Sequence, residues 1–283
     1  MYQVTLDETA VDQFLKETRD LTEQRLSYVP YLRSIAAERL QNIVGDAFAQ
    51  RICEIINDRE SGGFTLRPGR PLESIDQQVV LGTAVSHLIG LPNFDDMTQN
   101  FYACFTVKDT DESDSYLRQA YRRFTLHTDG TYVTEPTDWI LMMKMEEQHA
   151  QGGDSLLLHL DDWEDLDKFT ADPIGSVPLT YRSPPSKNYP VDVKKPTFHE
   201  RDGRPCMSFI DQFVYPDTIE QARYLRDLCD SMEHSASIIS LPLPTDHMVV
   251  LNNHFWLHGR EAFEKHPDLH RMLMRQRGYF RGG

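Results

Sequence analysis

Three side chains able to hold a metal ion lie in two short motifs that are far apart in the chain. His127 and Asp129 are separated by one residue in HTDG (127–130), and His258 lies in NNHFWLHGR (252–260). In an extended segment residues i and i+2 point the same way, so His127 and Asp129 can grip one ion together. Two histidines and one carboxylate are the facial triad that suits Fe(II) and leaves positions open for other ligands. We therefore predict an Fe(II) site formed by His127, Asp129 and His258.

The third ligand of this site is open to other readings, because an HxD motif occurs often by chance. Five further histidines compete with His258 for the role: His149, His159, His254, His266 and His270. His254 and His258 are four residues apart and would chelate zinc on a helix, but no HExxH motif is present and the neighbouring aromatics favour a strand edge or turn. A zinc hydrolase, a sensor that binds without turnover and a purely structural role for HTDG remain alternatives.

A row of arginines follows His258 in the segment RMLMRQRGYF. Arg271, Arg275 and Arg277 all have odd numbers, so on a strand they share one face with Leu273 and Tyr279. Such a row forms either a solvated basic edge that deters aggregation or a set of bidentate forks for carboxylates. Its closeness to His258 favours the carboxylate-binding reading.

The overall composition supports capture of anions by local arginines. The formal net charge is −15 and no basic stripe is visible, which argues against a nucleic-acid partner. An acidic protein repels anions at long range, so an anionic ligand needs a local cluster of cations. No apolar run approaches the ~18 residues that span a membrane, and the acidic N-terminus lacks a secretory pattern. We expect a cytoplasmic protein whose four dispersed cysteines are reduced.

The elements that must position these residues fall into two parts. Residues 1–60 and 75–89 show the three-and-four spacing of helices. From about residue 101 short apolar runs alternate with turn signals, which predicts strands; the runs are FYACFTV, RRFTL, DWILMMKM, SLLLHL, CMSFI, SIISL, HMVVLNN and RMLMRQRGYF.

Two helices are expected to interrupt these strands, near 160–169 and 217–232, and the polar segments 108–116 and 183–196 are expected to be surface loops. We predict a mainly β fold with flanking helices in a single domain, 1–283. Its first part, 1–95, would be largely helical, and 100–283 would form the β-core with inserted loops.

The motifs together resemble the 2-oxoglutarate-dependent oxygenases of the taurine dioxygenase and clavaminate synthase type. That pattern contains HxD, then Gly-Gly-(Asp/Glu)-(Thr/Ser), a distal histidine and an RxxxR pair. Here the second segment is Gly152-Gly153-Asp154-Ser155, and the pair is Arg271 and Arg275. The four elements have the order and spacing of the family.

Two longer segments resemble the carbon-starvation-induced CsiD family more closely: HTDGTYVTEPTDWILMMKMEEQHAQGGDSLLLHLDDW and NNHFWLHGREAFEKHPDLHRMLMRQRGYF. This resemblance implies a double-stranded β-helix (jelly-roll) fold and a homotetramer. It also implies hydroxylation of a small dicarboxylate, glutarate, to L-2-hydroxyglutarate, with O2 consumed and 2-oxoglutarate converted to succinate and CO2. The main alternative is the same chemistry on another small carboxylic or sulfonic acid.

The resemblance also implies roles for single residues. His127, Asp129 and His258 match the iron ligands, and Arg271 matches the arginine for the distal carboxylate of 2-oxoglutarate. Ser155 matches the hydroxyl that assists it, where the wider group often has threonine. Arg275 matches the arginine that reads the acidic group of the substrate, and Arg277 is a further candidate for that role. The segment from His258 to Arg271 is slightly longer than in the taurine enzyme, so the arginine roles could be exchanged. Phe105, Phe124 and Tyr279 are candidate lining residues.

Overall fold

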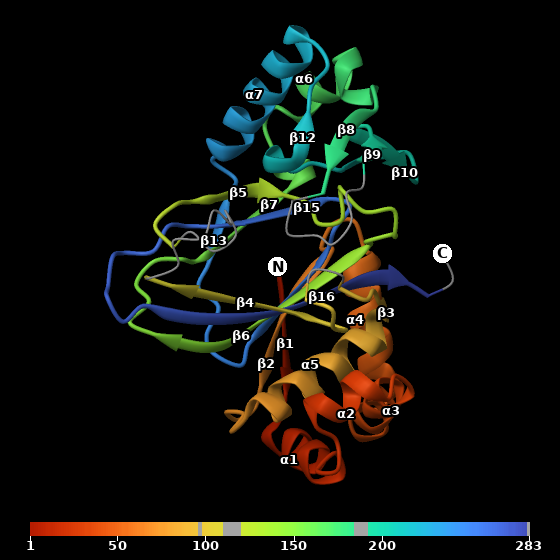
Figure 1. Cartoon of the computed structure of the whole chain (residues 1–283). Helices are drawn as coiled ribbons and strands as arrows, with labels where there is room; N and C mark the ends of the chain where they lie inside the picture. The colour runs from red at the N-terminus through yellow and green to blue at the C-terminus, as the bar shows by residue number, and fades with distance from the viewer. Residues whose placement is uncertain (96–97, 110–119, 184–191, 282–283) are drawn as a thin grey trace.

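A computed structural model describes residues 1–95, 98–109, 120–183 and 192–281 of the chain (Figure 1). Its α-helices are α1 Glu8–Glu17, α2 Glu23–Tyr28, α3 Tyr31–Val44, α4 Asp46–Asn57, α5 Ile75–Ile89, α6 Leu166–Ala171 and α7 Ile219–Glu233. Its strands are β1 Tyr2–Leu6, β2 Gly63–Pro68, β3 Gly90–Pro92, β4 Ala103–Lys108, β5 Phe124–His127, β6 Trp139–Gln148, β7 Ser155–His159, β8 Leu179–Arg182, β9 Asp192–Lys195, β10 Phe198–Arg201, β11 Arg204–Met207, β12 Val214–Tyr215, β13 Ile239–Leu241, β14 Met248–Asn252, β15 Trp256–Arg260 and β16 His270–Phe280. The protein is therefore mainly β with several helices, as predicted.

Two sheets form the centre of the molecule. The larger sheet has the order β1-β2-β14-β6-β16-β3, with β4 also paired to β16. Only its β1–β2 pair is parallel. The smaller sheet has the order β13-β7-β15-β5 and is antiparallel throughout. Strands that are neighbours in space come from distant parts of the sequence, so motifs over 100 residues apart can meet here.

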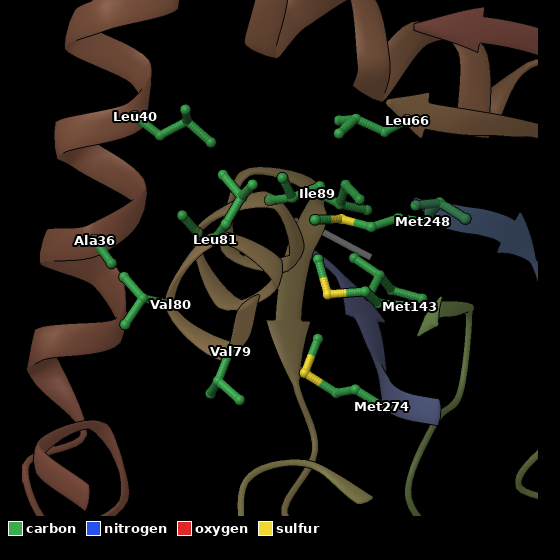
Figure 2. Close-up of a cluster of buried hydrophobic side chains, with 14 of the residues drawn as sticks. Ala36, Leu40, Leu66, Val79, Val80, Leu81, Ile89, Met143, Met248 and Met274 are labelled. Atoms are coloured by element: carbon green, nitrogen blue, oxygen red, sulfur yellow. The ribbon is translucent and has the colours of Figure 1, made fainter. Parts of the chain in front are cut away.

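The N-terminal helices cover one face of the larger sheet. Helix α5 begins at Ser74, whose side chain accepts a hydrogen bond from the Gln77 amide, and most of its residues are buried. Figure 2 shows Val80 and Leu81 of α5 among the side chains of α3 and the methionines of the sheet, which come from β6, β14 and β16. Burial of this apolar surface, at roughly 25 cal/mol per Å², fixes the larger sheet from its outer side.

A second apolar core lies on the other side of the larger sheet. It includes Ile140, Val249 and Leu251 of that sheet, and Leu156 and Leu158 of the smaller one. Helix α7 and the strands β8, β9 and β12 form a further layer beyond the smaller sheet (Figure 1). The smaller sheet is therefore held between two layers, which limits the movement of any side chain it carries.

The predicted helix at 75–89 is confirmed as α5, but the prediction that the first 60 residues are helical was partly wrong. Tyr2–Leu6 forms β1, and the N-terminal part also supplies β2 and β3 to the larger sheet. The alternating pattern in YQVTL, exposed on one side and buried toward Leu6, is that of an edge strand. Five residues are too few to stand out beside the long helical pattern that follows.

The two predicted loops have different outcomes. In 183–196, residues 192–195 form strand β9 and 184–191 lie outside the described residues; in 108–116, Lys108 ends strand β4 and 110–116 lie outside the described residues. Among the residues that the structure describes, no helix is long and apolar enough to cross a membrane.

Candidate active site

The three predicted metal ligands meet at the smaller sheet. His127 is the last residue of β5 and pairs directly with His258 on β15, with the ring centroids 4.2 Å apart. Asp129 follows His127 by two residues. One ligand atom from each of the three side chains can be chosen so that all lie within 4.8 Å of one another. The geometry that a single shared ion requires is therefore present.

His258 reaches this position from the middle of β15, and not from a strand edge or turn as the neighbouring aromatics suggested. The chain leaves β14 at Asn252, turns through 253–255 and returns as β15. This turn also fixes the first motif, because Asn253 accepts a hydrogen bond from the Asp129 amide at 2.8 Å and donates one to the Asp129 carbonyl at 2.9 Å. The NN before the distal histidine is thus a positioning signal that sequence reasoning missed.

The donor atoms of the three residues fit a metal ion. His258 Nδ1 is buried and has no hydrogen-bond partner among the described residues, and the buried Asp129 Oδ2 has an ion pair with Arg275. The Nδ1 atom of His127 lies 2.8 Å from the Thr125 carbonyl oxygen, which orients the ring and leaves Nε2 for an ion. Burial lowers the pKa of His258 to about 3, so its ring is neutral near pH 7. Two neutral imidazoles and one carboxylate match the preference of Fe(II) for a facial triad.

The charge of Asp129 is set by its surroundings. Burial alone would raise the pKa of its carboxyl group, but the positive charge of Arg275, together with that of Arg277, outweighs that effect and holds the pKa well below its usual range. Arg275 Nη1 is 3.1 Å from Asp129 Oδ2. Asp129 is therefore an anion at neutral pH and is available as a ligand.

Gly259 allows the two histidine-bearing strands to lie close together. A Cβ atom at this position would lie 2.5 Å from the Phe124 carbonyl oxygen in β5. We expect Gly259→Ala to displace β5 and with it His127, lowering turnover at least tenfold and stability by about 1–3 kcal/mol, as overpacking usually does. Steady-state kinetics and thermal unfolding measure both effects.

The matched control for Gly259→Ala is Gly203→Ala, at an exposed turn where a Cβ meets nothing within 4 Å. That change should affect stability through backbone strain alone and leave turnover unchanged. Equal effects of the two substitutions on turnover would show that the close approach at Gly259 does not position the site.

A cavity beside the metal ligands lies between the two sheets. Its lining comes from both of them: Phe105, Val107, Phe124, His127, Met142, Ser155, His258, Gly259, Arg260, Arg271, Leu273 and Arg275. Phe105 and Phe124 therefore line the site as predicted. Tyr279 does not, since its side chain is at the exposed end of β16.

Arg271 and Ser155 both line this cavity, although more than 100 residues separate them in the sequence. Arg271 is 5% exposed, and its Nε has no hydrogen-bond partner among the described residues. Burial lowers the pKa of Arg271 from its ordinary value, with Glu147 and Asp154 opposing that shift. A buried guanidinium with an unsatisfied N–H is costly, so the site favours an anion.

Arg260 is a lining residue that sequence reasoning missed. It pairs with Ser155 across β15 and β7, and its Nη1 donates to the Ala120 and Glu261 carbonyl oxygens at 3.3 and 3.1 Å. The Phe263 ring lies against both the Arg260 and the Arg271 guanidinium groups. The signal was visible as HGR, because residue 260 is two after His258 and so points to the same side of a strand.

Arg275 makes ion pairs that the sequence did not foresee. Its Nη2 lies 2.9 Å from Asp95 Oδ2, while its Nη1 contacts Asp129. All three side chains are less than one-tenth exposed. Asp95, Arg275 and Asp129 therefore form a buried carboxylate–arginine–carboxylate chain that ends at the candidate metal centre.

We expect Asp95→Asn to weaken Fe(II) binding about tenfold, the range typical of partners that orient a ligand. Without the Asp95 charge, Arg275 is attracted more strongly to Asp129 and competes with the ion for that carboxylate. Fe(II) titration under anaerobic conditions measures the change. Asp217→Asn, at an exposed position, is the control; an Fe(II) affinity equal to wild type in Asp95→Asn would rule out this coupling.

Arg277 is buried next to this row of three charged side chains, but its interactions differ from those of Arg275, which contacts two carboxylates. It is 6% exposed, and its Nε and Nη1 have no hydrogen-bond partner among the described residues. Its charge contributes to the low pKa values of Asp129 and Asp95. Arg271, Arg275 and Arg277 are thus all buried on β16. Because they are buried, they do not form a solvated basic edge.

The other histidines do not join the triad. His159 contacts the Arg59 carbonyl oxygen, His149 stacks on His266, and His270 pairs with Glu146. His254 belongs to a different cluster, with His199 and Cys206. In the described part of the chain, His258 is the one candidate third ligand whose ring lies against His127.

Comparison with known proteins identifies the family of this chain. The family model named CsiD matches residues 1–280. This chain belongs to the CsiD family. Proteins named glutarate 2-hydroxylase from Klebsiella pneumoniae (strain 342) and Citrobacter koseri are 45% and 44% identical to it, over 99% of this chain and 87% of each relative.

Solved structures show the fold that this CsiD-family chain shares. Asparagine oxygenase matches with a TM-score of 0.76 and 16% identity, covering 99% of this chain and 93% of the other. The non-haem iron oxygenase OrfP, in complex with Fe, succinate and (3S)-hydroxy-L-Arg, matches with a TM-score of 0.75 and 15% identity, covering 99% and 94%. At these identities the likeness establishes the fold alone.

Proposed function

We propose that this protein is an Fe(II)- and 2-oxoglutarate-dependent oxygenase that hydroxylates glutarate at C2 to L-2-hydroxyglutarate. 2-Oxoglutarate would be converted to succinate and CO2 as O2 is consumed. The observation that carries the proposal is the convergence of His127, Asp129 and His258 beside a cavity that ends in buried arginines. The relatives named glutarate 2-hydroxylase, 44–45% identical over nearly the whole chain, support the choice of glutarate.

The architecture supports a double-stranded β-helix formed by the two facing sheets. We propose that residues 1–283 fold as one domain, because strands from the N-terminal part complete the larger sheet. We also propose a cytoplasmic homotetramer, which rests on the family resemblance.

His127, Asp129 and His258 would hold the iron, which supplies activation of O2 for attack on an unactivated C–H bond. The protein's own part is to orient the two acids and to exclude water. Arg271 and Ser155 would bind the distal carboxylate of 2-oxoglutarate, and Arg260 would add positive charge at the same end of the cavity. Phe105 and Phe124 provide the apolar walls.

Arg275 and Arg277 would read a carboxylate of the substrate. Arg275 lines the cavity and keeps its Nε unsatisfied, although both of its Nη atoms contact carboxylates; Arg277 keeps two N–H groups unsatisfied but is not among the described lining residues. We therefore propose that Arg275 faces the substrate and that the unsatisfied N–H groups of Arg277, behind it, add to the binding of the carboxylate. Arg275 links substrate binding to Asp129.

The proposed function is tested by an aerobic screen of short dicarboxylates with Fe(II) and 2-oxoglutarate, with succinate as the readout. We expect glutarate to stimulate succinate formation more than acids one carbon shorter or longer. Succinate formation that does not depend on O2 would contradict the oxygenase, whereas no succinate with any acid would favour a zinc hydrolase or a sensor that binds without turnover. A different best substrate among carboxylic or sulfonic acids would keep the chemistry and change the specificity.

We expect Arg277→Met to raise the KM for glutarate by about 30-fold or more, because loss of a buried charged partner costs 2–5 kcal/mol and each 1.4 kcal/mol is tenfold. Fe(II) and 2-oxoglutarate should still bind. The measurement is initial rate against glutarate concentration, with the exposed Arg223→Met as control. An unchanged KM for glutarate in Arg277→Met would remove this residue from the substrate site.

A further inference from the structure

A second cluster of metal-binding side chains lies beside the turn that joins β14 and β15. His199 and Cys206 are directly paired across the β10–β11 hairpin, and His254 is in the turn 253–255. One ligand atom from each of the three lies within 4.8 Å of the others. Among the described residues, this cluster and the triad at His127 are the two groups with such geometry.

We propose that His199, Cys206 and His254 form a second metal site, which takes a borderline-soft divalent ion such as Zn(II). Two imidazoles and a thiolate are ligands that zinc prefers, and three protein ligands leave a fourth tetrahedral position for water. A thiolate ligand distinguishes this site from the oxygen- and nitrogen-only triad. The inference does not depend on the proposed hydroxylase activity.

The backbone holds the three ligands in place before any ion binds. The β10–β11 pairing fixes His199 opposite Cys206. The Met207 amide, next to Cys206, donates a hydrogen bond to the His254 carbonyl oxygen at 2.8 Å, which ties the hairpin to the turn. Cys206 is buried, and the two histidines are partly buried. Binding therefore needs little reorganisation of the chain.

His254 also has the partner that metal-bound histidines usually have. Its Nε2 lies 2.8 Å from Asp138 Oδ1, and the Phe280 amide fixes the other oxygen of that carboxylate at 2.9 Å. A carboxylate that accepts from one ring nitrogen selects the tautomer whose other nitrogen has a free lone pair. Arg201 Nη1 is 2.6 Å from the same Nε2. Because the Arg201 side chain is 42% exposed, its guanidinium can move aside when Nε2 carries the proton.

The charges around the cluster can accommodate a divalent ion. Arg59 and Arg204 both pair with Asp161, and Arg201 lies 3.7 Å from Asp138. Two aspartates and the Cys206 thiolate offset most of the positive charge of the three arginines and of Lys195, which acts on His199. Burial raises the pKa of the Cys206 thiol, but Arg59 Nη1, 3.9 Å from Sγ, opposes that shift and favours the thiolate form that metal binding requires.

An ion can reach the cluster through two cavities that border it. His199 and His254 line a cavity that also contains Asp129, while Cys206 and His254 line another that contains Arg59 and Arg204. The same turn contains Asn253, whose side chain accepts a hydrogen bond from the Asp129 amide and donates one to the Asp129 carbonyl oxygen. An ion at this second site would thus fasten the β10–β11 hairpin to the turn that positions a ligand of the first site.

The test is an anaerobic Co(II) titration of the metal-free full chain, followed by absorption spectroscopy. Co(II) reports both sites, but only the second gives a thiolate-to-metal charge-transfer band. We expect two ions per chain in the wild type, with that band. We expect one ion and no band in Cys206→Ser, and one ion with the band retained in His258→Ala.

Two further variants keep the result interpretable. Cys229→Ser is the matched control and should keep the band, because Cys229 is in α7, away from the cluster. His199→Gln should lose the second ion even if Cys206→Ser folds poorly. A wild-type titration without a thiolate band, or a band that survives in Cys206→Ser, would overturn the proposal. Retention of Zn(II) in place of Co(II), measured by metal analysis after dialysis, should follow the same pattern across the variants.

Discussion

His258→Ala is expected to abolish glutarate-dependent succinate formation. Replacing a residue that only orients a metal ligand typically lowers activity by up to ~100-fold, and loss of the ligand itself should lower the rate by well over that. His258 lies in the middle of β15, is directly paired with His127 and is buried at the wall of the cavity. Its removal leaves two ligands, one of which, Asp129, is already attracted by Arg275. With only two protein ligands, the ion would lose both affinity and the open face that O2 and 2-oxoglutarate need.

The measurement for His258→Ala combines the rate with Fe(II) affinity from an anaerobic titration. His234→Ala, at the exposed end of α7, is the control and should match the wild type in both. Thermal unfolding separates a lost ligand from a lost fold, since a neutral, buried imidazole replaced by a smaller apolar group should leave the sheet intact. Wild-type iron affinity in the folded His258→Ala variant would contradict the assignment of this residue.

Arg271→Lys is expected to raise the KM for 2-oxoglutarate about 100-fold while leaving Fe(II) binding unchanged. Lysine keeps the charge but loses the planar fork that can hold a carboxylate through two hydrogen bonds. The buried position makes the loss large, because truncation of a buried charge pair costs 2–5 kcal/mol. A loss of 100-fold corresponds to about 2.8 kcal/mol at 1.4 kcal/mol per tenfold.

The kinetic pattern distinguishes the roles of the arginines. In Arg271→Lys the defect should be in the KM for 2-oxoglutarate, whereas in Arg277→Met it should be in the KM for glutarate. Arg226→Lys, exposed on α7, serves as the control. If Arg271→Lys instead raised only the KM for glutarate, the two arginine roles would have to be exchanged.

The main features of the site could be predicted because they depend on local periodicity. The spacing of His127 and Asp129 places both on one side of an extended chain, and the odd numbering of Arg271, Arg275 and Arg277 places them on one face of β16. The long helix at 75–89 has a clear N-cap and apolar residues throughout. Each of these predictions needs only the residues of one element.

The rest depends on which strands become neighbours, and one sequence does not specify that pairing. Asp95 meets Arg275 across 180 residues, and Asn253 meets Asp129 across 124. Neither contact has a periodic signal. Strands β1 and β2 were missed for a related reason, since they are short and are stabilised by pairing with each other and with β14 rather than by their own pattern.

The His199–Cys206–His254 cluster shows the same limit. Each residue alone has an ordinary explanation, and His254 was considered only as a competitor for the first site. Hairpin pairing and the fold of the β14–β15 turn bring the three together. A spacing rule for zinc motifs cannot find such a set, because its members are contributed by separate elements.

The central claim is that this protein inserts an oxygen atom from O2 into glutarate, using iron held by residues 127, 129 and 258. A single-turnover reaction with oxygen-18-labelled O2 tests it most directly, with Fe(II)-loaded protein, 2-oxoglutarate and glutarate mixed before the gas is admitted. We predict equal amounts of succinate and 2-hydroxyglutarate, with the label in the new hydroxyl group. Unlabelled product, or succinate formed without any hydroxylated glutarate, would contradict the account.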